Sequence, residues 1–259
     1  MQSQTPIPLR RRTVGEVVAE DYRLGAVFKR FGIDFCCGGG LPIEEACERR
    51  GVSYPELESA LEAAQPARAE GQMPDTRGWP PAFLAEYIVN VHHRYCRETL
   101  PVLEQFTQKV ARVHGPGRPA LVALHRTLMD LSHEMEAHMT AEEEEVFPAI
   151  RALEEDSSGS AAAPGSAATP GSAATPGSAP ASDVPTAPGP DLLARMEDEH
   201  ETAGGLMAEI RRLSDDFTPP EGACATWRAA YAKLEEFESD LHRHVHLENN
   251  VLFPAVRAG

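Results

Sequence analysis

The sequence predicts an all-α protein, in which a bundle of four long antiparallel helices follows a smaller helical domain. Apolar residues recur at spacings of three and four over four long stretches, at residues 81–114, 119–154, 190–215 and 222–257. Shorter stretches with the same spacing alternate with turn residues between residues 13 and 65. Four long helices, each with one apolar face, bury those faces against one another and form a bundle.

The first predicted domain covers residues 10–65. Thr13 and Glu16 have the T-x-x-E spacing of a capping box, so a helix is expected to begin there. Cys36 and Cys37 are followed by three glycines, which predicts a turn between short helices. The segment QPARAEGQMPDTRGWPP, rich in Pro, Gly and polar residues, then predicts a connector to the second domain.

The second predicted domain, residues 78–259, is interrupted by a low-complexity segment. Between residues 156 and 190 the unit PGSAAT repeats in tandem, with no aromatic residue and no apolar periodicity. Such a composition cannot bury enough apolar surface to offset the entropy of ordering the chain. We therefore predict a disordered tether between the two halves of the bundle.

Charge and composition exclude several classes of protein. The net charge is -16, with 40 Asp and Glu against 24 Lys and Arg, which disfavours nucleic acid as a partner. The basic cluster Arg10–Arg12 is not followed by the apolar segment of a signal peptide, and no apolar run is long enough to span a membrane. Five cysteines, an odd number, fit a reducing compartment. We expect a soluble cytoplasmic protein.

The ends of the second and fourth predicted helices repeat each other. HMTAEEEEVFPAIRA, which begins at His138, aligns without a gap with HVHLENNVLFPAVRA, which begins at His244. Each copy has a glutamate four residues after its histidine, so both side chains lie on one face of the helix. Because the repeat indicates a duplicated hairpin, each half should also supply a first helix, with His93 and His200 as the candidate histidines.

Together these positions predict a centre for two metal ions, with the ligands His93, His138, Glu142, His200, His244 and Glu248. Four imidazoles and two carboxylates suit two iron or manganese ions bridged by the carboxylates, whereas structural zinc favours thiolates. A single His–Glu pair at this spacing is usually a solvated surface pair, but its recurrence in register favours metal. The histidine-rich set points toward haemerythrin chemistry.

Several residues near these ligands are expected to have structural rather than metal-binding roles. Four other histidines are expected at the surface or next to the ligands: His92, His133, His242 and His246. Glu143, Glu144 and Glu145 are expected to form a solvated run of charge. Phe147 and Phe253 are expected in the core at the end of the bundle, and the prolines that follow them should bend or end their helices.

Longer motifs identify a resemblance to a family. They are FGIDFCCGGG at 31–40, TLPVLEQFTQKVARVHG at 99–115, MEDEHETAGGLM at 196–207, CATWRAAY at 224–231 and HVHLENNVLFP at 244–254. The chain resembles the iron-sulfur cluster repair di-iron proteins, bacterial stress proteins with a haemerythrin-like four-helix bundle behind a short N-terminal domain. The resemblance covers nearly the whole chain except the tether.

The resemblance implies a non-haem di-iron centre that donates iron or handles nitric oxide, in the repair of iron-sulfur clusters damaged by nitric oxide or oxidants. It places the family's six iron ligands on the six residues above, with Glu142 and Glu248 as the bridging carboxylates. It also implies thiolate chemistry at an exposed pair, Cys36 and Cys37, for which the alternative is a buried apolar turn. Glu134 and Glu199 match positions suited to a polar access path, but both are equally typical of ordinary helix-surface charges.

The chain departs from the family at Cys96, where a second histidine is common, and in its long central connection. The implied partners are iron-sulfur proteins as clients and nitric oxide or dioxygen as small ligands. One alternative is a haemerythrin-like protein that binds or senses these gases, and another is reduction of nitric oxide at the two irons. The sequence leaves open the clients, the iron source, an Fe–Fe or mixed metal pair, and whether the chain forms a homodimer.

Overall fold

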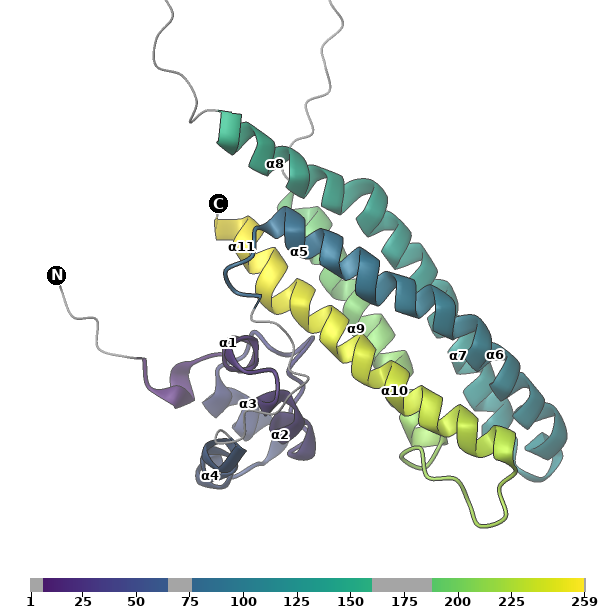
Figure 1. The fold of residues 1–259 in the computed structure, drawn as a ribbon. Helices are drawn as coiled ribbons and strands as arrows, with labels where there is room; N and C mark the ends of the chain where they lie inside the picture. The colour runs from purple at the N-terminus through teal and green to yellow at the C-terminus, as the bar shows by residue number, and fades with distance from the viewer. Residues whose placement is uncertain (1–6, 65–75, 160–187, 259) are drawn as a thin grey trace, which may run out of the picture.

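The structure is a computed structural model that describes residues 7–64, 76–159 and 188–258. Its architecture is all-α, as predicted, with four short helices beside a bundle of long ones (Figure 1). Within the described ranges the β pairing is limited to an isolated bridge between Thr13 and Pro42.

The short helices are α1 (Val14–Glu20), α2 (Leu24–Arg30), α3 (Ile43–Arg50) and α4 (Tyr54–Ala64). The predicted capping box is present, because the Thr13 hydroxyl accepts the Glu16 N–H and the Glu16 carboxylate accepts the Thr13 N–H. The Cys-Cys-Gly-Gly-Gly segment forms the connection from α2 to α3. This turn therefore joins two of the four short helices α1–α4, which we call the N-terminal group.

The four bundle helices follow the predicted spans closely, and three of them contain a π-helical turn. In order along the chain they are α5 (Pro81–Ile88), a π-helical turn Val89–His93 and α6 (Arg94–His114); α7 (Pro119–Ala141), a π-helical turn Glu142–Val146 and α8 (Phe147–Gly159); α9 (Pro190–Leu213); and α10 (Ala225–Leu247), a π-helical turn Glu248–Leu252 and α11 (Phe253–Ala258). α6 packs against α7 and α10, and α7 packs against α9.

The prolines after Phe147 and Phe253 do not end their helices, whereas a bend at these prolines stays a prediction. Pro148 and Pro254 each occupy the second position of an α-helical segment that follows a π-helical turn. Proline disturbs a helix least where the regular hydrogen-bond pattern is already interrupted, as it is at a π-helical turn. α8 therefore continues to Gly159 and includes the first four residues of the predicted tether, whose residues 160–187 lie outside the described part of the chain.

Two apolar clusters fill the molecule. One joins the N-terminal helices to the bundle and includes Phe28 and Leu241. The other lies where α5, α8 and α11 meet and includes Ile88, Phe147 and Phe253, so both phenylalanines are in the core as predicted. Along each bundle helix, the predicted ligands lie between residues of one cluster and residues of the other.

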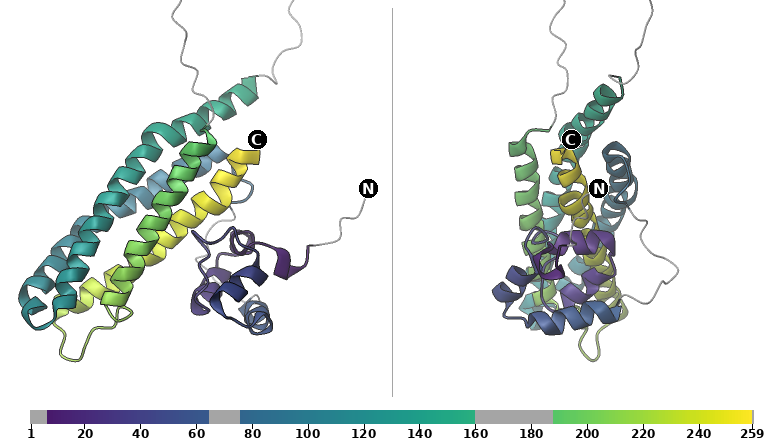
Figure 2. Two further views of the ribbon diagram at one scale, coloured as in Figure 1. Left: turned by 180° about the vertical axis from the view of Figure 1, so that it is seen from behind. Right: turned by 90° about the vertical axis from the view of Figure 1, so that its left-hand side faces the viewer.

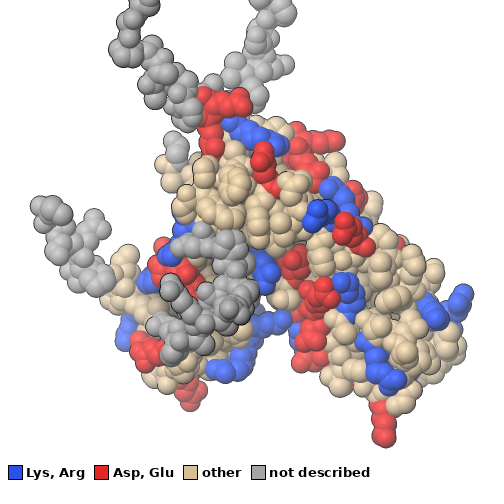
Figure 3. All heavy atoms as spheres, viewed as in Figure 1, with Lys and Arg blue, Asp and Glu red and all other residues tan. Residues whose placement is uncertain are grey.

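The N-terminal helices lie on the α10 side of the bundle, as the front and rear views both show (Figures 1 and 2). α1 packs against α10 and against the π-helical turn Glu248–Leu252. On the face drawn in Figure 3, acidic and basic side chains are interspersed over both groups of helices. Among the helices of the described residues, none combines the length and the apolar character that crossing a membrane requires.

Candidate metal centre

The six predicted ligand residues meet inside the bundle. They come from all four bundle helices: His93 ends the first π-helical turn, His138 lies on α7, Glu142 begins the second π-helical turn, His200 lies on α9, His244 lies on α10, and Glu248 begins the last π-helical turn. Each of the six is at most 4% exposed. π-helical turns are frequent at functional sites, and here each one contains a predicted ligand.

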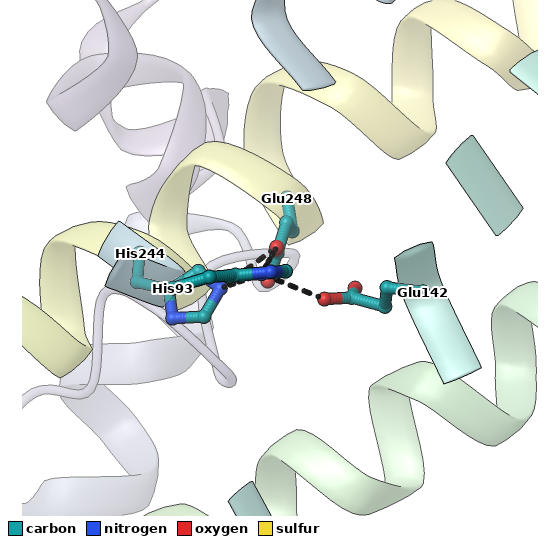
Figure 4. Close-up of side chains that lie close together, drawn as sticks. All are labelled: His93, Glu142, His244 and Glu248. Carbon is teal, nitrogen blue, oxygen red and sulfur yellow. Dashed lines mark hydrogen bonds and ion pairs between the residues drawn. The ribbon is translucent and has the colours of Figure 1, made fainter. Parts of the chain in front are cut away.

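The six side chains form two donor sets that share their carboxylates. One set is His93, Glu142, His244 and Glu248, drawn in Figure 4, and the other is His138, Glu142, His200 and Glu248. Within each set the ligating atoms lie within 4.8 Å of one another. Glu142 Oε2 is 3.3 Å from His93 Nε2 and 3.4 Å from His138 Nε2. The Glu248 oxygens are 2.9 Å from His244 Nε2 and 3.0 Å from His200 Nε2. Each carboxylate therefore lies between the two histidine pairs.

The donor set fits a pair of metal ions. Both carboxylate oxygens of Glu142 are buried, and neither accepts a hydrogen bond from a residue that the structure describes. A buried carboxylate without a partner is costly, and a bound cation would compensate its charge. Imidazole nitrogen with carboxylate oxygen is a donor combination that iron and manganese accept. The chemistry and the geometry both favour a dinuclear cation site at this point.

The same carboxylates raise the pKa of two histidines of the donor sets. Burial lowers the pKa of His93, but the nearby negative charges of Glu142 and Glu248 outweigh it and raise that pKa to about 10. For His138 the same competition between burial and the nearby carboxylates raises the pKa to about 9. The electrostatic field at the centre thus favours cationic charge.

The outer nitrogens of three ligand histidines are held by residues around the centre. The distance from Nδ1 to its acceptor oxygen is 2.7 Å for His93 with Glu143, 2.8 Å for His138 with Glu199 and 2.8 Å for His200 with Asn249. Donation of Nδ1–H fixes the tautomer and directs the Nε2 lone pair at the centre. The Nδ1 atom of His244 is buried and has no hydrogen-bond partner among the described residues.

Sequence reasoning missed two of these acceptors. Glu143 was expected in a solvated run, yet it is half-buried and accepts hydrogen bonds from His93 and from Arg97 Nη1, the latter at 2.7 Å. Burial raises the pKa of Glu143, but these two hydrogen bonds outweigh it, and the pKa is lowered. Asn249 received no role from the sequence. The available signal was the repeat, because Glu143 and Asn249 occupy equivalent positions directly after Glu142 and Glu248.

Two of the four other histidines are fully buried. His92 stacks on His244, with ring centroids 5.7 Å apart, and its Nδ1 is 3.0 Å from Asp240 Oδ1. His246 is 1% exposed and its ring packs against Phe35 of the N-terminal group. His133 is exposed, and a surface position is one of the two outcomes that the sequence predicts for it. Burial next to the ligands is therefore the outcome for His92 and His246.

The two acidic candidates for an access path differ. Glu199 is half-buried, and the hydrogen bond from His138 lowers its pKa. Glu134 is also half-buried, one turn before His138 on α7, but no hydrogen bond or ion pair joins it to another described residue. Cys96, the departure from the family pattern, is fully buried, and burial raises the pKa of its thiol.

Cys36 and Cys37 lie beside the bundle with their sulfur atoms 3.9 Å apart. Cys36 is buried, and its hydrogen bond with Cys37 together with burial raises the pKa of its thiol well above the usual range, so the expected exposed thiolate is wrong for this residue. Cys37 is half-buried, and its Sγ is 3.5 Å from the backbone oxygen of His200. Both cysteines line a pocket of about 470 Å³ between the N-terminal group and α9.

Comparisons with known proteins agree with this architecture. Residues 85–165 and 180–256 match the family model described as hemerythrin HHE cation binding domain, and residues 10–65 match a domain of unknown function, DUF542. A hemerythrin domain of this kind binds metal cations.

Curated relatives cover nearly the full chain. The iron-sulfur cluster repair protein YtfE of Pectobacterium atrosepticum is 34% identical over 96% of this chain and 98% of its own length. The protein of the same name from Edwardsiella ictaluri is 36% identical over 95% of this chain and 96% of its own. The iron-sulfur cluster repair protein ScdA of Staphylococcus haemolyticus is 31% identical over 93% and 95%. The chain therefore belongs to the iron-sulfur cluster repair protein family, with a hemerythrin cation-binding domain as its helical bundle.

Proposed function

We propose that this chain is a di-iron protein that repairs iron-sulfur clusters damaged by nitric oxide or oxidative stress. The observation that carries the proposal is the pair of buried donor sets sharing Glu142 and Glu248. The names of the relatives support repair over gas binding or sensing alone. The clients would then be iron-sulfur proteins, with nitric oxide or dioxygen as small ligands of the centre.

Six residues would hold the two iron ions: His93, His138, Glu142, His200, His244 and Glu248. When bound, such a pair supplies Lewis acidity and a change of oxidation state. Glu142 and Glu248 lie where they would bridge the two ions, since each is within 3.4 Å of a histidine nitrogen in both donor sets.

The surrounding residues would tune this centre. Glu143, Glu199 and Asn249 accept the Nδ1–H groups of three ligand histidines and so keep their Nε2 atoms directed inward. The apolar clusters on either side exclude water along the bundle axis, which strengthens the electrostatic interactions between them. In this proposal Glu199 acts as a hydrogen-bond acceptor for His138, and any role of Glu134 in access is independent of it.

Cys37, the half-buried member of the cysteine pair, would meet the damaged cluster, which is the substrate, with the buried Cys36 beside it. Support comes from the pocket that both cysteines line together with the cationic side chains Lys29 and Arg50. All five cysteines are unpaired, which fits action in a reducing compartment such as the cytoplasm. Residues 10–65, which carry the cysteine turn, and residues 78–259, which carry the donor sets, would be the two domains.

The first test is the iron content of the anaerobically purified full-length chain. We expect about two iron ions per chain, as in other dinuclear helical bundles. A His138→Ala/His244→Ala double variant removes one imidazole from each donor set and should lose most of the iron. His133→Ala removes an exposed histidine of the same helix and should retain the full amount. No iron in the parent chain, or equal iron in all three proteins, would contradict the metal assignment.

The second test separates repair from gas binding. A client whose iron-sulfur cluster has been destroyed by nitric oxide is incubated under anaerobic conditions with the iron-loaded chain, sulfide and a thiol reductant, because rebuilding the cluster needs sulfide as well as iron. Recovery of the client's visible absorbance and activity with the parent chain, but not with the double variant, would support repair. Binding of nitric oxide without recovery of the client would instead favour the haemerythrin-like binding function.

A further inference from the structure

The two copies of the repeat differ at the residue that follows the shared carboxylate. In the first copy, Glu143 accepts the His93 Nδ1–H and an Arg97 N–H on the same oxygen, Oε1. In the second copy, Asn249 Oδ1 accepts the His200 Nδ1–H at 2.8 Å. A carboxylate can only accept hydrogen bonds, whereas an amide accepts with its oxygen and donates with its nitrogen. Asn249 can therefore accept a hydrogen bond from one partner and donate a hydrogen bond to another at the same time.

The second partner of Asn249 belongs to the N-terminal group. Its Nδ2 is directed at the backbone oxygen of Cys36, at 3.5 Å, and the adjacent Asn250 Nδ2 donates to the same oxygen at 3.0 Å. The neighbouring Cys37 Sγ lies 3.5 Å from the backbone oxygen of His200. The cysteine turn and His200 are thus connected both through Asn249 and by direct contact.

We propose that Asn249 is a positioning residue that couples the Cys36–Cys37 turn to the imidazole of His200. The consequence of this coupling for metal binding rests on the proposed function, in which His200 would be a ligand of only one of the two metal positions. The metal position formed with His138 and His200 would then respond to a change in the conformation of the cysteine turn. Glu143 and His92, the partners of His93 and His244, make no hydrogen bond or ring contact with the N-terminal group among the described residues, so these two imidazoles lack this connection to the cysteine turn.

Geometry gives the physical reason for the coupling. The amide of Asn249 is planar, so its oxygen and its nitrogen turn together. When a substrate or a reaction at the cysteine turn displaces the Cys36 carbonyl, the amide rotates and its oxygen leaves the His200 Nδ1–H. The tautomer and direction of that imidazole are then no longer fixed. No comparable connection reaches His93, because Glu143 is held by Arg97 of the bundle itself.

The test is a double-mutant cycle in the metal-free, full-length chain, with the alkylation rate of Cys37 by iodoacetamide as its readout. His200→Ala and Asn249→Ala should each accelerate alkylation, and the double variant should be no faster than Asn249→Ala alone. Residues in one hydrogen-bond network typically show non-additivity of about 2- to 150-fold. His93→Ala and Glu143→Gln, the equivalent pair of the other half, should leave the rate unchanged. Additive effects, or equal acceleration by the control pair, would overturn the coupling.

Asn249→Asp is the conservative variant that separates the two ends of the connection. It keeps an acceptor for His200 but loses the donor to Cys36, so Cys37 alkylation should accelerate while His200 stays oriented. With iron added, Asn249→Ala should bind one of two ions about 10- to 100-fold more weakly, and Asn249→Asp should restore the affinity. Parental alkylation in Asn249→Asp would overturn the proposal. A parent chain that binds no iron would contradict the proposed function alone, because the alkylation cycle is measured without metal.

Discussion

The two halves of the bundle contribute the same kinds of side chain to the donor sets but surround them differently. Each half contributes two histidines and one glutamate to the centre, and the glutamate of each half reaches both donor sets. The first half completes its surroundings from within the bundle, through Glu143 and Arg97. The second half uses Asn249 and Asn250 and carries the N-terminal group on α10. A duplicated hairpin can therefore keep its ligand chemistry while one copy becomes a docking site.

The largest expected effect tests the equivalence of the two halves at the shared carboxylates. Because Glu142 and Glu248 each belong to both donor sets, Glu142→Gln and Glu248→Gln should each lose most of the roughly two ions per chain rather than one. Metal analysis after anaerobic iron loading and gel filtration measures this loss. Glu144→Gln, an exposed neighbour, should retain the full content. Retention of one ion by either variant would show that its carboxylate serves a single position.

The second prediction concerns the ion pairs through which the second half binds the N-terminal group. Glu238 on α10 is 3% exposed and accepts hydrogen bonds from Lys29 of α2 and Arg211 of α9, both at 2.6 Å. Loss of a buried, charge-assisted hydrogen bond typically costs ~1.5–3 kcal/mol. We therefore expect Glu238→Gln to lower the free energy of unfolding at pH 7 by this amount, with Glu235→Gln, an exposed neighbour, as the control.

The same site gives a pH dependence. Burial raises the pKa of Glu238, but the hydrogen bonds from Arg211 and Lys29 outweigh it, and the pKa is lowered from its usual 4.5. Because the folded pKa is the lower one, the stabilisation is complete above about pH 4.5 and is lost as the pH falls through the folded value. Urea denaturation of parent and Glu238→Gln should show a difference that narrows below this pH. A constant difference would contradict the assignment to this carboxylate.

The third prediction compares two acidic residues of similar burial. Glu199 accepts the Nδ1–H of His138, whereas Glu134 has no such contact. Loss of an acceptor behind a metal ligand typically weakens metal binding by about 10- to 100-fold. Glu199→Ala should therefore lose its iron at a chelator concentration about 10- to 100-fold lower than the parent chain requires. Glu134→Ala should lose its iron at the same chelator concentration as the parent. An equal effect of both variants would favour a general role of acidic charge near the bundle.

The smallest effect is expected in the glycine turn beside the second half. A Cβ at Gly39 would lie 2.6 Å from the backbone oxygen of Phe35 and would also clash with the Asn250 side chain, whereas a Cβ at Gly40 meets nothing within 4 Å. Overpacking of a close contact costs ~1–3 kcal/mol. Gly39→Ala should lower the free energy of unfolding by this amount and increase the alkylation of Cys37, and Gly40→Ala should do neither. Equal stability of the two variants would mean that the turn adjusts freely.

The six residues of the two donor sets could be predicted because their pattern is local. The spacing of four residues between His138 and Glu142, and its repetition in the second half, needs no knowledge of the fold. The sequence alone distinguishes His93 from His92 only weakly, since the two histidines are adjacent. Burial does not distinguish them either, because both are fully buried. Their different roles depend on the rotation of the first π-helical turn, which directs His93 at Glu142 and His92 at Asp240.

The surroundings could not be predicted in the same way, because they depend on contacts between distant segments. Glu143 reads as one member of an acidic run until its partner, fifty residues earlier in the chain, is placed beside it. His246 is buried where Tyr22 and Phe35 of the N-terminal group pack against its ring. Burial of Cys36 has the same origin, since Asn250, 214 residues later, binds its backbone oxygen. Periodicity and the repeat therefore predict the helices and the residues of the donor sets, and tertiary contacts decide which residues surround those sets.

The π-helical turns have a consequence for insertions and deletions. A π-helical turn accommodates one residue more than an α-helical turn, and one residue corresponds to a rotation of about 100° around the helix axis. Removal of one exposed residue from Glu142–Val146 would restore α-helical geometry and leave Phe147, now fully buried, directed at its cluster. Removal of a residue from the α-helical turns on either side would instead rotate every residue beyond it. The π-helical turns are thus the places in the bundle helices where the chain length can change by one residue with the least effect on the packing beyond them.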